Sequence, residues 1–221
     1  MFENDHDRLK YQSGQPPTAD SVADAPDVIV SDDTLRENRV PPGQTRTRKW
    51  PVLHASTVPQ VTKEGWQLRV FGAVEREVTF NWEQFQELPR VKVFADFHCV
   101  TTWSRLGNLW EGVSTHEVLI RAGILPEAKF VICHAYDNNW STNLPLEEFL
   151  SGDALLADTH DGLPINAEHG GPVRGMVPKL YAWKSAKWIR GIELSETDRP
   201  GYWEQGGYHD LGDPWKEQRF R

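Results

Sequence analysis

The chain has few cysteines and no long apolar run, and these absences exclude several classes of protein. Only two of the 221 residues are cysteines, Cys99 and Cys133, and they form no CxxC pair, zinc-ligand spacing or CxxCH haem motif. No stretch of about 18 apolar residues occurs, so we expect no membrane span. The first residues have neither the basic and apolar regions of a secretory signal nor a twin arginine. We therefore expect a cytoplasmic protein, in which a disulfide is disfavoured.

Positive charge is also scarce. The 24 Lys and Arg residues are outnumbered by 32 Asp and Glu residues, which gives a net charge of −8 and argues against a nucleic-acid partner. Much of this excess lies in residues 1–40, which hold nine acidic and four basic residues and little apolar periodicity. We predict a flexible acidic arm over 1–40 and one globular domain over 41–221.

Short apolar segments dominate the globular part and predict strands over 66–71, 74–80, 91–97, 129–135, 154–158, 173–177 and 188–194. The predicted helices are short. Asn81 caps one that ends at residue 88, Ser114 and Glu117 form a capping box for one that Gly123 closes, and a third covers 145–150. Strands and helices do not alternate regularly, so we predict an α+β fold with mixed sheets.

Cys99 is the first candidate for chemistry. It follows a predicted strand and precedes a polar loop, Thr101 to Ser104, where a rigid scaffold can present a reactive group. The alternative is a small buried apolar residue, which is the role of most free cysteines. Cys133 lies inside the apolar segment 130–133 and is expected to be structural.

A second candidate is a basic segment without acidic residues. Residues 169–192 contain no Asp or Glu, and begin with His169 and two glycines that allow close backbone approach to a ligand. The basic residues of this segment are Arg174, Lys179, Lys184, Lys187 and Arg190. They could bind a buried phosphate, or they could form a solvated basic face of a strand.

Two aromatic segments flank these candidates. Residues 46–54 combine Arg46, Arg48, Lys49 and Trp50 with His54, and form either part of a site or an ordinary entry to the domain. The tail over 201–215 is rich in aromatic residues, which rarely sit exposed as a group. We expect the tail to pack over the core or over the rim of a pocket.

Three segments together resemble one known family. They are FHCVTTWS at 97–104, EHGGPVRGMVPKLYAWKSAKWIRGIEL at 168–194 and GYWEQGGYHDLGDPWKEQR at 201–219. Their order and spacing are similar to those of the short, single-domain prokaryotic members of the sulfite-oxidase-like, molybdopterin-binding oxidoreductases. The resemblance implies a sulfite-oxidase-type fold and a molybdenum–molybdopterin cofactor, with Cys99 as the protein ligand of the metal.

The resemblance also implies further site residues. The implied cofactor contacts are Arg48, His54, His134, His169, Arg174, Ser185, Ala186 and Lys187. Candidates for the substrate pocket are Trp103, Arg105 and Asp137, beside Cys99. The chemistry expected is two-electron oxo transfer on a small oxyanion, a sulfoxide or an N-oxide.

The sequence departs from the longer sulfite oxidases in two respects. Their arginine-rich segment after the molybdenum cysteine corresponds here to residues 100–104, which contain no arginine, and this argues against sulfite as substrate. The chain also carries no haem domain, so we expect a separate electron-transfer partner.

Two other functions stay open at this point. Cys99 could be a nucleophile with a histidine as base, although His98 is badly placed because adjacent residues of a strand point to opposite faces. The chain could also be a non-catalytic binding module that retains the fold without the metal.

Overall fold

The computed structural model describes residues 18–22, 27–137 and 139–221. Its strands are β1 (Val28–Val30), β2 (Thr45–Thr47), β3 (Gln67–Gly72), β4 (Val78–Asn81), β5 (Arg90–His98), β6 (Trp103–Ser114), β7 (Phe130–Ala135), β8 (Ser141–Pro145), β9 (Leu155–His160), β10 (Leu163–Pro164), β11 (Arg174–Met176) and β12 (Ile189–Ser195). The α-helices are α2 (Trp82–Gln86), α3 (Thr115–Ala122), α4 (Leu146–Phe149) and α5 (Tyr202–Gln205). Short 3-10 turns are η1 (Ala19–Val22), η2 (Asp32–Leu35), η3 (Ala167–His169), η4 (Ala182–Lys184) and η5 (Pro214–Lys216).

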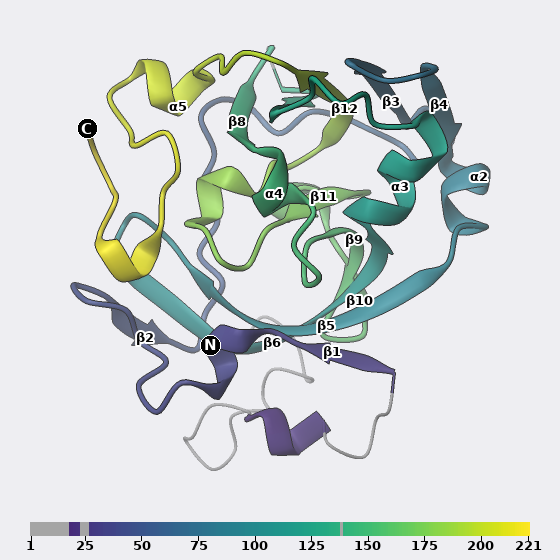
Figure 1. Ribbon diagram of the computed structural model, residues 1–221. Coiled ribbons are helices and arrows are strands. Elements are labelled where there is room, and N and C mark those ends of the chain that lie inside the picture. Colours follow the sequence, from purple (N-terminus) through teal and green to yellow (C-terminus); the bar gives the residue numbers. More distant parts are fainter. Residues whose placement is uncertain (1–17, 23–26, 138) are drawn as a thin grey trace.

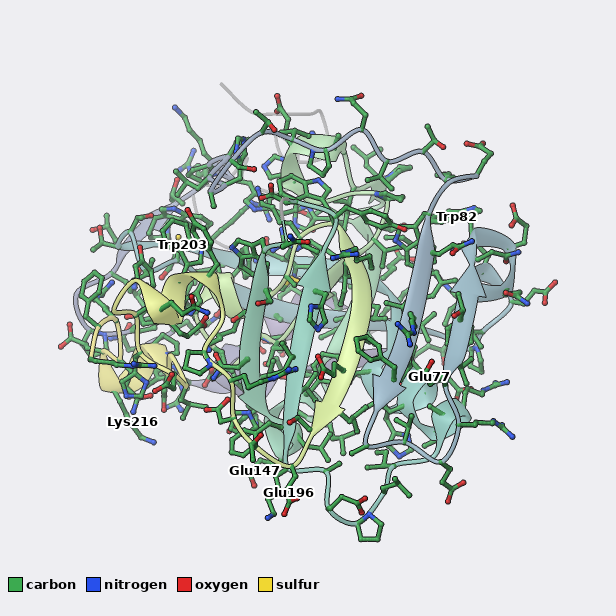
Figure 2. The ribbon with its side chains drawn as sticks, turned by 90° about the horizontal axis from the view of Figure 1, so that it is seen from above. Glu77, Trp82, Glu147, Glu196, Trp203 and Lys216 are labelled. Carbon is green, nitrogen blue, oxygen red and sulfur yellow. The ribbon has the colours of Figure 1, made fainter. Side chains whose placement is uncertain are left out.

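Two sheets form the frame of the molecule (Figure 1). The first has the order β1-β5-β6-β9-β10, with β2 added to β6 and β11 added to β9. The second has the order β4-β3-β12-β7-β8, and Figure 2 shows its strands side by side, with α5 beyond the β8 edge. Each sheet contains parallel pairs, β1–β5 and β2–β6 in the first and β3–β12 in the second, among antiparallel ones. The predicted α+β class with mixed sheets is confirmed.

Local sequence signals give most of the second sheet correctly. The segments predicted as strands over 66–71, 74–80, 129–135 and 188–194 overlap β3, β4, β7 and β12. Both predicted caps are present, because the side chain of Asn81 accepts from the backbone N–H of Gln84, and that of Ser114 from Glu117. Gly123 ends α3 with a positive φ of 72°. These elements depend on nearby residues, and local patterns are enough to predict them.

The longest strand, β6, was not predicted. We expected a polar loop after Cys99, but Trp103 and Ser104 already pair with Thr45 and Arg46 of β2. The pattern is hidden because β6 carries Arg105 and Asn108 into the interior, where both are fully buried. Buried polar partners satisfy these side chains, so the usual apolar signal of a strand is missing.

The described part of residues 1–40 is not a free arm. Strand β1 pairs in parallel with β5, from Val28 opposite Lys92 to Val30 opposite Phe94. Further along, Arg39 donates two hydrogen bonds to the carboxylate of Asp96, at 2.5 and 2.8 Å. The segment 28–39 therefore docks against the first sheet, whereas 1–17 and 23–26 lie outside the described residues.

Buried apolar side chains form two clusters. The larger one includes Trp66, Phe85 and Ile192 and packs under the second sheet. The smaller one, with Trp50, Phe97 and Trp110, packs against the first sheet, and its members Trp50 and Phe97 also line the cavity described next. No helix in the described ranges is long and apolar enough to cross a membrane.

Candidate functional site

Cys99 lies in a tight turn between β5 and β6. Its backbone N–H donates to the carbonyl of Trp103 at 2.8 Å, and the N–H of Thr102 returns to the carbonyl of Cys99 at 3.0 Å. Thr102 adopts a φ of 72°, which allows the chain to reverse within these few residues. The hydroxyl of Thr101 donates to the Cys99 sulfur at 3.2 Å. The two strands thus hold the sulfur in a fixed position.

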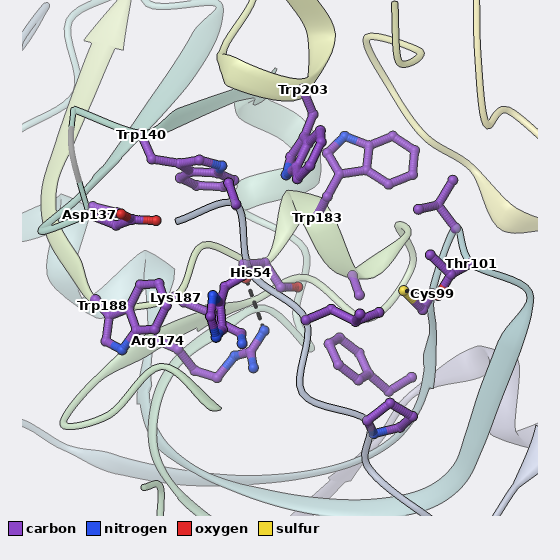
Figure 3. Close-up of a pocket in the computed structure, with 18 of the residues that line it drawn as sticks. His54, Cys99, Thr101, Asp137, Trp140, Arg174, Trp183, Lys187, Trp188 and Trp203 are labelled. Carbon is purple, nitrogen blue, oxygen red and sulfur yellow. Dashed lines mark hydrogen bonds between the residues drawn. The ribbon is translucent and has the colours of Figure 1, made fainter. Parts of the chain in front are cut away.

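The Cys99 sulfur borders a cavity of about 220 Å³ (Figure 3). Five segments that are distant in sequence form its walls, together with Arg174: residues 50–55, the turn at 97–103, residues 135, 137 and 140, the run 182–188 and the C-terminal tail. The tail and η4 contribute Trp203 and Trp183, which lie beside each other in Figure 3, while Asp137 and Trp140 lie across the cavity from Cys99. The walls are mainly aromatic, so the few charged groups that reach the cavity determine its polarity.

Two of these charged groups are Arg174 and Lys187. Arg174 is buried and donates to the backbone carbonyls of His169 at 2.8 Å and Ser185 at 3.0 Å. Lys187 donates to the carbonyl of Glu168 at 2.6 Å. Within the part of the chain that the structure describes, no carboxylate forms an ion pair with either cation. One buried and one partly buried positive charge therefore reach the cavity, and their hydrogen bonds in the described ranges go to backbone carbonyls.

Aromatic rings hold the Arg174 guanidinium in place. It lies 5.6 Å from the ring centroid of Trp50, 5.3 Å from that of Phe97 and 5.8 Å from that of Trp110. Such cation–π contacts stabilise a charge by about 0.5–2 kcal/mol each, most strongly when water is excluded. They do not neutralise it, so the charge stays available to an anion.

Burial makes both cations lose their proton more easily than they would in water. Loss of solvent lowers the pKa of Arg174 to about 9 and that of Lys187 to about 7, the latter also because Arg174 lies nearby. A bound anion would oppose these shifts. These shifts are what one expects of cations in an anion-binding pocket, which was one of the two interpretations of the basic segment 169–192.

The environment of Cys99 argues against a cysteine nucleophile. Burial raises the pKa of its thiol, and the hydrogen bond from Thr101 and the charge of Lys187 oppose this only in part. The neighbouring His98 is no base for it, because His98 is fully buried, bonds Ser104 Oγ through Nδ1 and has its pKa lowered to about 4 by burial. A coordinated metal, in contrast, removes the proton of a thiol outright.

Seven of the twelve residues proposed from the sequence line the cavity together. They are His54, Cys99, Trp103, Asp137, Arg174, Ser185 and Lys187. Asp137 is buried and accepts a hydrogen bond from the hydroxyl of Ser56, which ties the segment 50–56 to the opposite wall.

The other five lie elsewhere. Arg105 is fully buried and forms an ion pair with Asp161 at 2.9 Å. His134 faces Glu193 at 2.9 Å on the second sheet. His169 stacks behind Trp50, Ala186 is buried below the cavity, and Arg48 is exposed on the segment before Trp50.

Sequence reasoning missed several aromatic walls of the site. Trp140, Trp183 and Trp188 line the cavity, and the tail adds Trp203 and Tyr208. The sequence signals were the ten tryptophans of the chain and the aromatic tail over 201–215, which was expected to pack over the core or the rim of a pocket. The five residues come from three separate segments, so the sequence did not group them into one site. In residues 18–22, 27–137 and 139–221, no group of three or more His, Cys, Asp or Glu is placed to hold a metal ion.

Comparison with known proteins assigns this arrangement to a class. Residues 54–203 match the model of the oxidoreductase molybdopterin binding domain. The chain therefore belongs to the sulfite-oxidase-like family of molybdopterin-binding oxidoreductases, and its cofactor is molybdenum–molybdopterin.

Individual relatives agree. An uncharacterized oxidoreductase of Bacillus subtilis, YuiH, is 47% identical over 188 residues, which are 84% of this chain and 93% of that protein. The catalytic subunit MsrP of a protein-methionine-sulfoxide reductase from Campylobacter jejuni is 25% identical and covers 83% of this chain and 66% of its own length. The sulfane dehydrogenase SoxCD of Paracoccus pantotrophus shares the fold with a TM-score of 0.61 at 23% identity, over 65% of this chain and 41% of that one.

Proposed function

We propose that this enzyme performs two-electron oxo transfer, with Cys99 as the protein ligand of molybdenum and with a sulfoxide as the preferred substrate. The observation that carries the proposal is the position of the Cys99 sulfur in the same cavity as the buried Arg174 and the partly buried Lys187. A thiolate is a soft donor for a metal, and two cations without a carboxylate partner suit the phosphate of a pterin.

The residues present fit the cofactor. The buried Nε1 of Trp103 has no hydrogen-bond partner among the described residues, although Trp103 lines the cavity next to Cys99. A Cβ on Gly170 would lie 2.8 Å from the Cβ of Lys187, so only glycine allows this turn to approach so closely. We assign the metal to Cys99, and the pterin and its phosphate to Arg174, Lys187 and the turn at 185–187. His54, His169 and Arg48 are the remaining proposed contacts.

When bound, molybdenum–molybdopterin supplies two-electron redox chemistry coupled to transfer of an oxygen atom. The protein holds the thiolate at the turn after β5, keeps the guanidinium of Arg174 fixed between aromatic rings and excludes water with tryptophans. Proposed partners are a small-molecule substrate and a separate electron-transfer protein. The names of MsrP and of the YedZ1 relative from Azospira oryzae, both described as subunits, support a separate partner.

The charges around the cavity favour a neutral substrate. Sulfite and other oxyanions need a cation of their own, but we assign Arg174 and Lys187 to the cofactor. Arg105, the other candidate, already pairs with Asp161 at 2.9 Å. Asp137 adds a negative charge at the wall. A sulfoxide or N-oxide avoids this repulsion, and two relatives are named as protein-methionine-sulfoxide reductase subunits.

The test combines metal analysis with substrate comparison. Protein produced in cells that make the cofactor should contain about one molybdenum per chain. The reduced enzyme should convert methionine sulfoxide faster than the oxidised enzyme converts sulfite. Cys99→Ser should lose at least about 100-fold in activity while keeping much of the pterin, since the phosphate contacts lie elsewhere. Cys133→Ala is the matched control, because Cys133 is buried away from the cavity.

Three results would contradict parts of the proposal. Full activity of Cys99→Ser would exclude Cys99 as the ligand. Faster turnover of sulfite than of any sulfoxide would exclude the neutral substrate. Thiol-dependent activity in protein without molybdenum would favour the cysteine nucleophile, and a stable protein with neither activity would favour the binding module.

A further inference from the structure

A carboxylate is completely buried in the C-terminal tail. Glu204 lies in α5 and has no exposed surface. Its Oε1 accepts three hydrogen bonds, from Thr142 Oγ1 at 2.8 Å, from Trp183 Nε1 at 2.9 Å and from Lys184 Nζ at 2.6 Å. Glutamate is almost never fully buried unless it is paired, and here one oxygen serves three donors. Its place in the fold therefore depends on a specific set of partners.

The partner cation is buried as deeply. Lys184 has no exposed side-chain surface and also donates to the backbone carbonyl of Asn143 at 2.6 Å. Burial lowers the pKa of Lys184, and the negative charge of Glu204 opposes that shift. The pair thus joins three elements, namely η4 with Lys184, β8 with Thr142 and Asn143, and α5 with Glu204.

Two of these elements, η4 and α5, carry the aromatic wall of the cavity. Trp183 precedes Lys184, and Trp203 precedes Glu204, so each ion-pair partner is adjacent to a lining tryptophan. Tyr208 packs against both, with ring centroids 5.2 Å from Trp183 and 5.0 Å from Trp203. In Figure 3 the two indoles stand side by side at one wall, and in Figure 2 Trp203 is seen on α5 beside the second sheet.

Two glycines allow the backbone of the tail to contact β8 and the Trp183 ring closely. A Cβ on Gly201 would lie 2.2 Å from the carbonyl oxygen of Ser141, and one on Gly212 would lie 2.7 Å from the ring of Trp183. Gly212 also has a φ of 77° and accepts a hydrogen bond from the N–H of Tyr181 at 2.8 Å. The backbone of the tail therefore rests directly on β8 and on the indole, and its position controls the position of the wall.

We infer that Glu204 is a positioning residue that holds the aromatic wall formed by Trp183, Trp203 and Tyr208, and that this wall sets the size of the substrate that reaches Cys99. The inference rests on the proposed function in one respect, since it takes the cavity as the route of the substrate. An amide at position 204 can keep an oxygen facing the three donors, but its NH2 group would replace the buried Oε2, which has no hydrogen-bond partner among the described residues, and the buried ammonium of Lys184 would lose its counter-charge. The tail would then detach from η4 and β8, and the wall would widen.

The test uses the full-length, molybdenum-loaded enzyme and two readouts. Hydrogen exchange measures the protection of residues 201–212. Steady-state kinetics compare dimethyl sulfoxide with the larger methyl phenyl sulfoxide. In Glu204→Gln we expect exchange in 201–212 to rise about tenfold or more with β12 unchanged. We also expect the ratio of kcat/KM for dimethyl sulfoxide to kcat/KM for methyl phenyl sulfoxide to fall about fivefold. The fall should come from a lower KM for the larger sulfoxide rather than from a change in kcat.

Two further variants complete the design. Thr142→Val removes a single donor to Glu204 and keeps both charges, so it should show the same changes to a smaller extent even if Glu204→Gln does not fold. Glu117→Gln is the matched control, because Glu117 pairs with Arg121 on α3, at the opposite side of the molecule from the tail (Figure 1). It should alter neither readout.

The outcomes separate this inference from the proposed function. Unchanged exchange in 201–212 in both variants would overturn it, and so would raised exchange without any change in size preference. A native enzyme that turns over sulfite but neither sulfoxide would refute the proposed substrate. In that case hydrogen exchange in residues 201–212 tests the inference by itself. Increased exchange in Glu204→Gln would support the anchoring role of Glu204, and unchanged exchange would exclude it.

Discussion

The rings of Trp50 and His169 stack with their centroids 3.8 Å apart and their planes inclined by 27°. The Nε2 of His169 lies 3.0 Å from the carbonyl oxygen of Trp50. Burial lowers the pKa of His169 to about 4, so the ring is neutral near pH 7 and Nε2–H donates this bond. Trp50 belongs to the segment that enters the domain and His169 to the turn before Arg174. The stack therefore ties the cavity wall at Trp50 to the turn that precedes Arg174.

Loss of the Trp50 ring is expected to lower both the stability of the protein and its binding of the cofactor. Trp50→Ala removes the partner of His169 and one ring beside Arg174, so the free energy of unfolding should fall by about 3–5 kcal/mol and the molybdenum content should drop. Trp50→Phe keeps a stacked ring and should lose less of both. Urea unfolding and metal analysis measure these changes, and native values in Trp50→Ala would contradict the expectation.

A side chain at Gly170 is expected to displace Lys187. The φ of Gly170 is 104°, and an added Cβ would lie 2.8 Å from the Cβ of Lys187. Gly170→Ala should therefore lower stability by about 1–3 kcal/mol and reduce the pterin bound per chain. Gly152→Ala is the control, since a Cβ there meets nothing within 4 Å. Equal pterin content in the two variants would show that the turn does not contact the cofactor.

The buried pair of Arg105 and Asp161 is expected to stabilise the first sheet rather than to bind substrate. Asp161→Asn removes the carboxylate that pairs with the buried Arg105 guanidinium and should lower the free energy of unfolding by about 3–5 kcal/mol. Arg69→Gln, which breaks an exposed pair with Glu77, should cost less than about 1 kcal/mol. KM should remain native in Asp161→Asn enzyme that is still folded. A large rise in KM would instead place Arg105 in the substrate site.

Lys187 is expected to make stability depend on pH in protein prepared without cofactor. Its pKa is about 7 in the folded chain and 10.5 in the unfolded chain, so between these values the unfolded state binds more protons. The free energy of unfolding should therefore rise from pH 7 towards pH 10 because of this group. Lys187→Met should remove that part of the slope, as followed by chemical unfolding at each pH. Identical slopes in both proteins would contradict the shifted pKa.

The same group predicts how anion binding responds to pH. An anion that contacts Lys187 favours its charged form, so binding takes up a proton near pH 7 and weakens as the pH rises above that value. Inorganic phosphate is a usable probe for the cofactor-free chain, and calorimetry in two buffers of different ionisation enthalpy measures the proton uptake. No uptake would show that Lys187 does not face the bound anion.

The sequence by itself determined the elements whose causes are local. Short apolar segments predicted β3, β7 and β12, and the caps at Asn81 and Ser114 fixed the starts of α2 and α3. It also placed Cys99 at the end of a strand and identified the basic segment 169–192, because charge composition and strand ends can be read along the chain. The family motifs then related these two features to one cofactor.

Only the tertiary structure decided what depends on contacts between distant residues. Strand β6 could not be predicted because its buried polar residues, Arg105 and Asn108, need hydrogen-bond partners from other segments. Some of these partners, such as Asp161 for Arg105, lie more than 50 residues away in the sequence. The cavity joins side chains from positions 50 to 208, and the docking of β1 on β5 spans more than 60 residues. Long-range packing also determined that Arg174 lies at the cavity and Arg105 does not, although both are buried arginines on strands of the same sheet. Burial and pairing set the roles of such charges, and neither is encoded in the local pattern.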